Sequence, residues 1–441
     1  MSLRVLDLRG TKPPFGAALP RPSAPGAEVH DVVARILLDV RTNGDAAVVR
    51  QTAELDRVDV SDGLRVPVAE IDEARSRVDP DLSEALQVAF DRILAYHAHE
   101  GLPPGDLVDG GITVRHLTRA VERAGIYAPG GRARYPSTVL MCAAPARVAG
   151  VGSLALCVPP AADGKVDQAT LCAASIAGVD EVYRIGGAQA IAAMAYGTRT
   201  LPAVDVIAGP GNAYVAEAKR QVSGVVGVAS AFAGPSEIVV VAGPDAPAAF
   251  VAVDLVVQAE HGPDGLAWLV CWDASLAEAV SAEVDRIVAG SSRRADLEAT
   301  LATSGITCLV DGPEDALAVA NTIAPEHLEL MVPDEEGLAM LALVQNAGAV
   351  FIGDWSPASM GDYIAGPNHV LPTNRTARFA SALRADDFRK HLHAVQVTPE
   401  ALRTLGPLVI TLAGTEGLPA HADSVRLRLA ALGELGEGAA T

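Results

Sequence analysis

Leu154-Ala-Leu-Cys-Val158 is an apolar run, and a helical pattern over Gln168–Ile176 follows it after a short polar stretch. The alternation then repeats, with apolar runs at Glu181–Ile185 and Val204–Ala208 and helical patterns at Ala188–Ala195 and Ala213–Val222. Short strands that are apolar on both faces and alternate with helices indicate a parallel sheet with right-handed crossovers. This stretch therefore predicts an α/β fold.

A second set of short apolar runs follows, again with helical patterns between them: Glu237–Ala242, Leu266–Trp272, Thr307–Val310 and Val350–Gly353. We therefore expect two parallel-sheet domains, each an incomplete Rossmann-like unit. The larger would comprise residues 26–126 and 238–381, and the second would comprise residues 127–237.

The two ends of the chain lack the alternation of apolar runs and helical patterns that marks these domains. Residues 1–25 contain five prolines and predict an extended arm rather than part of a core. Apolar spacing predicts helices over 29–40 and 81–97. Residues 382–441 predict helices at Asp386–His393, Pro399–Leu405 and about 418–432, without a new sheet. We expect this segment to be a helical appendage that docks on another surface.

Composition excludes several classes of protein. The 441 residues carry a formal net charge of −20. The chain has no Lys/Arg cluster of the kind that binds nucleic acid. Its longest uncharged run, Gly337–Gly353, is too short and too polar to span a bilayer. Charged residues within the first ten positions do not fit a secretory signal, so we expect a cytoplasmic protein that binds neither nucleic acid nor membranes.

The five cysteines are odd in number and widely spaced, and no two form a CxxC pair: Cys142, Cys157, Cys172, Cys271 and Cys308. This predicts neither a disulfide framework nor a cysteine zinc site. Most of them lie in apolar runs, where a thiol packs as a small hydrophobic group.

Two glycine-rich turns follow predicted strands and lead into helices. They are Ile185-Gly-Gly-Ala-Gln189 and Gly209-Pro-Gly-Asn212. Backbone N–H groups at a helix start suit a phosphate or pyrophosphate. Neither turn matches G-x-G-x-x-G, so ordinary β–α turns remain an alternative.

Other segments bring acid, amide and imidazole side chains together. Gln258 and His261 are spaced to share a helical face, where His261 is either a metal ligand or a capping residue. Glu326 and His327 are adjacent and suit general acid–base catalysis, although a polar loop is the alternative. Pro325 disfavours helix at Ala324, which would let the backbone turn there.

Two further segments are candidates for a site. A Gly- and Pro-rich loop contains Asp362 and His369 within Ser359–Tyr363 and Gly366–Thr373. Long irregular loops in compact domains are often functional. Near the C-terminus, Glu416 and His421 flank the start of a predicted helix, where they either cap it or project into a site.

Taken together and in this order, the motifs resemble those of the histidinol dehydrogenase family, nearly from end to end. They are Tyr127-Ala-Pro-Gly-Gly131, Tyr135-Pro-Ser-Thr-Val-Leu-Met141, Gly186-Gly-Ala-Gln-Ala-Ile191, Gly209-Pro-Gly-Asn212, Ala233-Gly-Pro-Ser-Glu237, Gln258-Ala-Glu-His-Gly262, Ala324-Pro-Glu-His-Leu328, Gly361-Asp-Tyr363, Asn368-His-Val-Leu-Pro-Thr373 and Glu416-Gly-Leu418 with His421.

The resemblance implies the reaction L-histidinol + 2 NAD to L-histidine + 2 NADH, by way of the aldehyde. It implies a catalytic pair, Glu326 and His327. It implies a zinc ion, next to the substrate, held by Gln258, His261, Asp362 and His421. It implies substrate contacts from these four residues as well as from Ser236, His327 and Glu416. It implies NAD contacts from Tyr127, Gln189 and Asn212, which would make the second domain the NAD side and the larger one the metal and catalytic side.

The resemblance also implies a homodimer with exchanged segments, so that Glu416 and His421 would come from the partner chain. Two departures from the family are visible. Val228-Ala-Ser-Ala-Phe232 stands where the family usually has an Ile-Asp pair and is one residue longer. Arg375 stands where the family usually has Gly, which puts that turn in doubt.

Two other functions are compatible with these residues. In a zinc-dependent hydrolase on an α/β scaffold, Glu326 would activate a metal-bound water. That reading leaves the two glycine-rich turns without a role. A regulator that binds a metal or a nucleotide would not need an acid and a base side by side. Formation of NADH on mixing the protein with NAD and histidinol would distinguish an oxidoreductase from both the hydrolase and the regulator.

Overall fold

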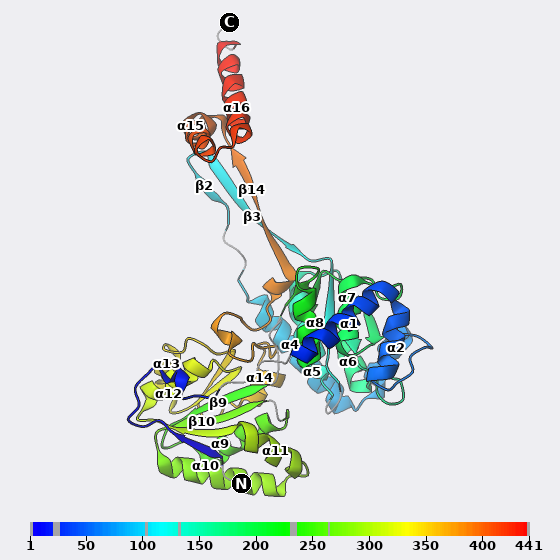
Figure 1. Cartoon of the computed structure of the whole chain (residues 1–441), viewed down its shortest axis with the longest axis vertical. Helices are drawn as coiled ribbons and strands as arrows, with labels where there is room; N and C mark the ends of the chain where they lie inside the picture. The colour runs from blue at the N-terminus through cyan, green and yellow to red at the C-terminus, as the bar shows by residue number, and fades with distance from the viewer. Residues whose placement is uncertain are drawn as a thin grey trace. The chain divides into compact units, whose positions relative to one another are not determined.

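The computed structural model describes residues 3–20, 27–101, 105–130, 134–229, 236–262 and 265–438. The chain divides into two compact units, one of residues 1–100 with 121–388 and one of residues 101–120 with 389–441. The larger unit contains two parallel sheets, and the smaller contains an antiparallel sheet and a pair of helices (Figure 1).

The first sheet of the larger unit has six parallel strands in the order β1-β11-β10-β9-β12-β13. Their bounds are β1 Arg4–Asp7, β9 Glu237–Ala242, β10 Leu266–Cys271, β11 Gly305–Leu309, β12 His327–Met331 and β13 Ala349–Ile352. One apolar cluster joins the sheet to α9 (Ala248–Ala259), α10 (Ala274–Gly290) and α11 (Arg294–Ser304). The other joins it to α12 (Pro313–Ile323) and α13 (Asp334–Leu341).

The central strand β9 is mostly apolar in sequence because both of its faces are buried. Ile238 and Val240 pack in the cluster with α9 and α10. Val239 and Val241 point the other way and pack in the cluster with α12. Successive side chains of a strand lie on opposite faces, so burial of both faces leaves no position for a polar alternation.

The second sheet of the larger unit has five parallel strands in the order β6-β5-β4-β7-β8. Their bounds are β4 Arg123–Tyr127, β5 Ser153–Val158, β6 Glu181–Arg184, β7 Val206–Ala208 and β8 Gly227–Val228. One face packs with α3 (Val68–Arg77), α4 (Pro80–Ala98), α5 (Pro136–Ala149) and α6 (Gln168–Ile176). The other packs with α1 (Ala27–Asn43), α2 (Asp45–Leu55), α7 (Gly187–Tyr196) and α8 (Ala213–Val222).

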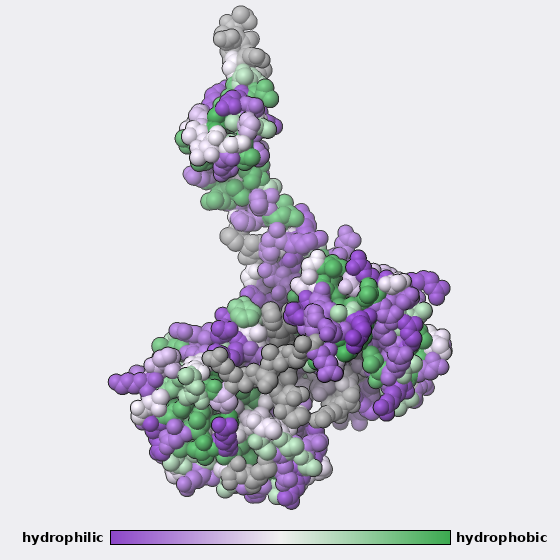
Figure 2. All heavy atoms as spheres, viewed as in Figure 1, coloured by the Kyte–Doolittle hydropathy of each residue, from purple (hydrophilic) through white to green (hydrophobic). Residues whose placement is uncertain are grey.

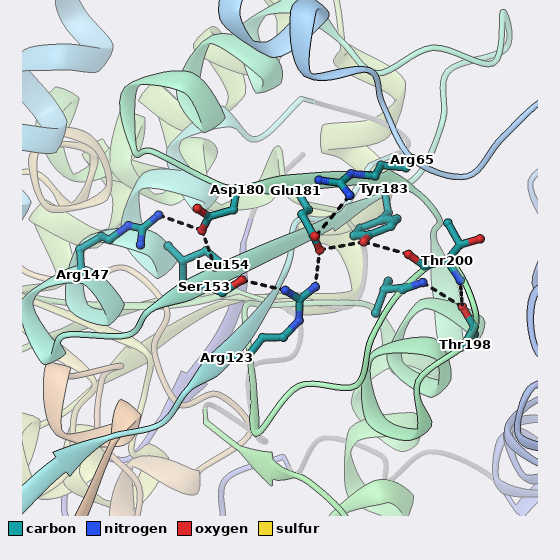
Figure 3. Close-up of polar contacts among 11 residues, drawn as sticks. Arg65, Arg123, Arg147, Ser153, Leu154, Asp180, Glu181, Tyr183, Thr198 and Thr200 are labelled. Carbon is teal, nitrogen blue, oxygen red and sulfur yellow. Dashed lines mark hydrogen bonds and ion pairs between the residues drawn. The ribbon is translucent and has the colours of Figure 1, made fainter.

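A polar network ties three strands of the second sheet together at their start (Figure 3). Arg123 of β4 donates to Ser153 Oγ of β5 at 2.7 Å and pairs with Glu181 of β6. Tyr183 also donates to Glu181, at 2.8 Å. These hydrogen bonds satisfy a carboxylate that is only 17% exposed, so burial of its charge is compensated.

The smaller unit is built on the antiparallel sheet β14-β3-β2, with bounds β2 Leu107–Asp109, β3 Ile112–Ala120 and β14 Arg389–Val397. The helices α15 (Pro399–Thr415) and α16 (Pro419–Gly438) pack against each other. The remaining elements are short and belong to the larger unit: η1 Phe15–Ala17, α14 Ala358–Tyr363, η2 Thr376–Arg378 and η3 Ala385–Phe388.

The α/β prediction is confirmed, and the seven predicted strands are present with ends within two residues of those expected. The three predicted crossover helices of the second sheet are present as α6, α7 and α8. The five cysteines are free and buried. Every helix among the described residues is too short or too polar to cross a bilayer.

The prediction of a helix over Asp386–His393, with no new sheet near the C-terminus, is wrong. Only Ala385–Phe388 is helical, as a 3-10 turn, and Arg389–Val397 forms β14. This strand pairs with β3 along its whole length, from Arg389 opposite Ala120 to Val397 opposite Ile112. The partner lies far away in the sequence, so local periodicity could not reveal the pairing.

The expectation that residues 1–25 stay outside a core is also wrong for the part described. The strand β1 pairs with β11, and four side chains of this segment are buried: Leu3, Leu8, Phe15 and Leu19. The strand precedes the first proline of the segment, so the prolines do not interfere with it. Residues 1, 2 and 21–25 of the predicted arm lie outside the described residues.

The packing of the first four helices differs from the expected grouping of residues 26–126 with 238–381. Val33 and Leu37 of α1 share an apolar cluster with Ile191 of α7. Phe90 and Ile93 of α4 share another with the strands of the second sheet. Helical periodicity shows which face of a helix is apolar but not which sheet that face covers. The domain boundaries themselves remain predictions.

Candidate active site

The predicted catalytic residues lie at the amino-terminal edge of the first sheet. His327 is the first residue of β12, opposite Ile238 of the neighbouring β9. Ser236 immediately precedes β9. In a parallel sheet each crossover helix returns to this edge, so the end of α9 brings Gln258 there as well. Residues from three elements thus meet at one edge.

A sharp turn separates Glu326 and His327 from the preceding helix. The helix α12 ends at Ile323, and Ala324 takes a left-handed conformation with φ of 54°. Pro325 fixes the next φ, and β12 begins at His327. The expected turn is therefore present, but it lies before the pair, and the pair itself enters a strand.

Glu326 is a buried carboxyl group that accepts two hydrogen bonds. Its Oε2 accepts from Ser236 Oγ at 2.5 Å and from the Glu237 amide at 2.9 Å. Burial raises the pKa of Glu326 to about 7, although the His327 charge and these hydrogen bonds act against the rise. A carboxyl group of this pKa can accept a proton near neutral pH.

His327 is held through both ring nitrogens. Nδ1 lies 3.1 Å from the Glu237 carbonyl oxygen, and Nε2 lies 3.2 Å from Asp362 Oδ1. Both partners only accept, so in this arrangement both nitrogens donate and the ring is an imidazolium. Burial opposes the charge, but attraction to Glu326 and the hydrogen bonds outweigh it and raise the pKa of His327 to about 9.

Gln258 is nearly fully buried beside this pair. Its Oε1 lies 3.3 Å from Ser236 Oγ, whereas its Nε2 is buried and has no hydrogen-bond partner among the residues that the structure describes. Ser236 has one hydroxyl hydrogen, which the shorter contact assigns to Glu326. With the amide in the opposite orientation, Nε2 would donate to Ser236 and Oε1 would remain as an oxygen ligand.

Asp362 lies at the end of α14 and connects the site to further imidazoles. Its backbone carbonyl accepts from His369 Nδ1 at 2.8 Å. Burial opposes ionisation of Asp362, but the hydrogen bond and charge of His327, together with His369 and His261, hold its pKa below the usual value. Asp362 is therefore a carboxylate facing positive charge, which is the state that a metal ligand needs.

Three of the four predicted metal ligands, Gln258, His261 and Asp362, belong to the larger unit. His261 lies just beyond α9 rather than on its face, and it interacts electrostatically with Asp362. Among the described residues, no three His, Cys, Asp or Glu side chains form a metal-binding group. Glu416 ends α15 and His421 lies in the first turn of α16, so both belong to the smaller unit, where they are exposed.

Tyr127 and Gln189, two of the three predicted NAD residues, lie at the carboxyl edge of the second sheet, where Gln189 belongs to the first glycine-rich turn. Tyr127 ends β4, and its hydroxyl oxygen accepts from the Gly187 amide at 3.1 Å. Gln189 Nε2 donates to Asp56 Oδ2 at 3.2 Å. Asp56 was not predicted, because no motif surrounds it; burial raises its pKa.

Asn212 lies at the second turn, where it caps α8. Its Oδ1 accepts from Tyr214 and Val215 amides, at 3.1 Å each. Gly209 has φ of 112° and packs so closely on the Tyr127 backbone that a Cβ would collide with it. The buried Lys219 donates to the Gly209 carbonyl. Tyr127 therefore contacts both glycine-rich turns, which lie next to each other.

Glu237 is a second acidic group that sequence reasoning did not single out, although it stands in a quoted motif. Its Oε1 accepts from the Asn374 amide at 3.0 Å. Burial, and then repulsion from Glu326, raise the pKa of Glu237 to about 8. Its position as the first residue of an apolar strand was the available signal.

The two departures from the family pattern have different outcomes. Arg375 has φ of 65°, so the left-handed turn that favours Gly is kept with an arginine in it. In the other departure, residues 230–232 of the stretch 228–232 lie outside the described residues, as do residues 233–235 of the motif that follows.

Comparison with known proteins gives one family over nearly the whole chain. A family model for histidinol dehydrogenase matches residues 19–429. The histidinol dehydrogenase of Ruegeria pomeroyi is 47% identical over 417 residues, covering 94% of this chain and 95% of that protein. That of Aromatoleum aromaticum is 46% identical over 406 residues, covering 91% and 92%. The crystal structure of histidinol dehydrogenase from Elizabethkingia anophelis matches with a TM-score of 0.90 at 33% identity, covering 98% of this chain and 99% of that one.

Proposed function

The chain belongs to the histidinol dehydrogenase family, and we propose that it oxidises L-histidinol to L-histidine through a bound aldehyde, with NAD as the oxidant. The observation that carries this proposal is the buried pair Glu326 and His327. One has a pKa near neutrality, and the other has two directional hydrogen bonds. Two proton acceptors fit a reaction that removes protons at two stages.

His327 acts as the base for the alcohol. To accept a proton, it must first give up the Nε2 proton that it donates to Asp362. Its Nδ1–H stays with the Glu237 carbonyl, which fixes the neutral tautomer with Nε2 as the accepting atom. His327 then takes the hydroxyl proton of histidinol as the first hydride leaves and releases that proton to water. It takes a second proton, from a hydroxyl group of the hydrated aldehyde, as the second hydride leaves.

Glu326 acts on water. Between the two hydride transfers, it deprotonates a water that adds to the aldehyde carbonyl and forms the hydrated aldehyde. The hydrogen bonds from Ser236 and the Glu237 amide stabilise Glu326 in the ionised form that this step needs. Two bases are needed because the protons come from different atoms, the hydroxyl group of the substrate for His327 and a water molecule for Glu326.

The side chains around the pair fit a zinc ion. The proposed ligands are one amide oxygen, two imidazoles and one carboxylate: Gln258, His261, Asp362 and His421. This is a nitrogen and oxygen donor set that suits zinc. The buried Gln258 Nε2 has no hydrogen-bond partner within the described part of the chain, which supports the amide orientation that leaves its oxygen to a cation. Bound zinc would supply a Lewis-acidic centre that orients the imidazole and amine of histidinol.

The substrate would also contact Ser236, His327 and Glu416. NAD would bind at the joined glycine-rich turns, through Tyr127, Gln189 and Asn212, and would supply a nicotinamide ring that accepts the hydride. The N–H groups at the start of α7 suit its pyrophosphate. A zinc hydrolase would not need these turns.

We also propose a homodimer in which Glu416 and His421 reach the partner's site. Large apolar side chains are exposed on the smaller unit, and Figure 2 shows hydrophobic surface over its sheet and helices. They include Leu107, Val108, Val395, Leu408, Leu412 and Leu427, each at least 57% exposed. Exposed apolar surface of this kind marks an interface. A cytoplasmic location fits a biosynthetic dehydrogenase.

Full-length protein loaded with zinc should convert L-histidinol and NAD to L-histidine, with two NADH formed for each histidine. Chelation of the metal should stop turnover, and added zinc should restore it. Formation of one NADH with the aldehyde as the final product would contradict the proposed role of Glu326. Binding of zinc and NAD without any turnover of histidinol would favour a regulator and overturn the proposal.

A further inference from the structure

Two carboxyl groups are buried against each other behind the site. Asp254 of α9 is 7% exposed, and Glu329 of β12 is 1% exposed. Their neighbours in the sequence are apolar, Val253 and Leu255 on one side and Leu328 and Leu330 on the other. Acidic groups in such positions cost free energy, so their presence calls for a compensating interaction.

One compensating interaction is a backbone hydrogen bond, in which Glu329 Oε1 accepts from the Ala358 amide at 2.8 Å. The other comes from Asp254, whose carboxyl group lies close enough to that of Glu329 for the two acids to share a proton. Two carboxylates have no hydrogen to share, so one of the acids is protonated. Glu329 Oε2 is buried without a hydrogen-bond donor among the described residues, which favours a protonated acid over a carboxylate in this pair.

The electrostatics agree with this assignment. Burial raises the pKa of Asp254 to about 6, while its hydrogen bond with Glu329 holds it down. Burial, and then repulsion from Asp254, raise the pKa of Glu329 to about 8. Both pKa values are raised, so at neutral pH the two acids keep one proton between them and carry a single negative charge.

The pair connects the three elements that carry the proposed site residues. Asp254 precedes Gln258 by four positions, one turn of α9. Glu329 follows His327 by two positions, so both lie on the same face of β12. The amide bound by Glu329 belongs to the first residue of α14, the short helix that ends beside Asp362.

We propose that Asp254 and Glu329 are positioning residues, a proton-sharing carboxyl pair that fixes α9, β12 and α14 relative to one another. Through these elements, the pair would hold Gln258, His327 and Asp362 at the distances that the oxidation requires. An apolar pair of similar size would fill the same space but would leave the Ala358 amide without an acceptor. The inference rests on the proposed function, because it takes Gln258 and Asp362 as zinc ligands.

Zinc affinity of the full-length protein, measured by competition with a chromogenic chelator, tests the proposal without relying on turnover. Glu329→Met removes the acceptor and the donor at similar volume. It should weaken zinc binding by ~10- to 100-fold, the usual effect of losing a group that orients metal ligands. Glu329→Gln keeps an oxygen for the Ala358 amide and an N–H for Asp254, so it should recover most of the lost affinity.

Glu181→Gln supplies the matched control. It changes a largely buried acid of the second sheet, whose partners are Arg123, Tyr183 and Arg65 rather than residues of the proposed zinc site (Figure 3). It should lower thermal stability while zinc affinity stays the same. If Glu329→Met behaves in this way too, the carboxyl pair only supports the fold, and the inference is overturned.

Asp254→Ala carries the test if Glu329→Met does not fold. It is a smaller change at the helix, and it removes the acid that shares a proton with Glu329, so zinc binding should weaken by a similar factor. Unchanged zinc affinity in this variant would overturn the inference but leave the proposed metal site standing. Absence of zinc binding by the unaltered protein would overturn the proposed metal site and this inference with it.

Discussion

Ser236 donates its hydroxyl hydrogen to Glu326 across 2.5 Å, within a site where the carboxyl group is almost fully buried. The hydrogen bond favours the ionised carboxylate, whereas burial favours the neutral acid. The two effects, together with the His327 charge, leave the pKa of Glu326 at about 7. Ser236 thereby contributes to the basicity of Glu326 as well as to the proposed substrate contact.

Replacing this hydroxyl should move the working pH of the enzyme. In Ser236→Ala the ionised Glu326 loses a hydrogen bond, so its pKa should rise by about one pH unit. The rising limb of kcat for aldehyde oxidation should shift to higher pH by the same amount. The measurement is a kcat–pH profile with the aldehyde as substrate. A lowered kcat with an unmoved limb would show that Ser236 does not tune Glu326.

Glu326→Gln should separate the two stages of the reaction. The amide cannot deprotonate water, so aldehyde oxidation should slow by ~10²–10⁴-fold while alcohol oxidation stays much closer to normal. Single-turnover NADH formation from histidinol and from the aldehyde measures each stage. In His327→Ala both stages should fall by that factor. Equal losses at both stages in Glu326→Gln would mean that the assigned roles are wrong.

The sequence was sufficient where the signal is local. The apolar runs of the central strands are buried on both faces, so each is visible without knowing its partners. The strand β12 was not predicted, because its polar residues, His327 and Glu329, interrupt the apolar run and serve the site instead. The strand β14 was not predicted either, because its partner β3 lies in another part of the chain.

The site shows the same division. The motifs, through the family resemblance, gave the proposed roles of Glu326 and His327. They could not give the amino-terminal edge of the sheet as the location, since that depends on where α9 and β12 end. The acids Asp254 and Glu329 match no motif. In the sequence each appears only as a single acidic residue between apolar ones. Such a position predicts nothing by itself, and the structure is needed to show that the two acids are neighbours.

Lys219 should make stability depend on pH in a measurable way. Burial lowers its pKa from 10.5 to about 8. Below pH 8 the amine is charged in both the folded and the unfolded protein, and folding bears the full cost of burying it. Between about pH 8 and 10.5 the folded protein releases the proton first, so stability should rise, by about 3 kcal/mol in total.

Lys219→Met should lack this rise. The measurement is the difference in free energy of unfolding between the variant and the unaltered protein at pH 7 and at pH 10. The difference removes the contribution of other groups, such as Cys142, whose pKa burial raises to about 12. If the difference in free energy of unfolding were the same at both pH values, burial would not lower the pKa of Lys219.

Arg375→Gly should stabilise the protein. Arg375 has φ of 65°, a conformation that costs an L-residue about 1 kcal/mol and costs Gly little. Its Nε is buried and finds no hydrogen-bond partner in the described segments, which adds to the cost. The greater freedom of Gly in the unfolded chain offsets part of the gain, so we expect a net increase of about 1 kcal/mol or less. Thermal unfolding of the two proteins decides the sign, and a lower Tm for the glycine variant would contradict it.

Subunit mixing tests whether one active site uses residues from two chains. His327→Ala damages the larger unit and leaves His421 intact, while His421→Ala does the reverse. Each variant alone should be nearly inactive. If His421 reaches the partner's site, a mixed dimer pairs one intact larger unit with one intact His421 and regains a complete site. Random reassociation of equal amounts should then restore about a quarter of the unaltered activity. If His421 served its own chain, every site in the mixture would keep one defect, and mixing after dissociation would restore nothing.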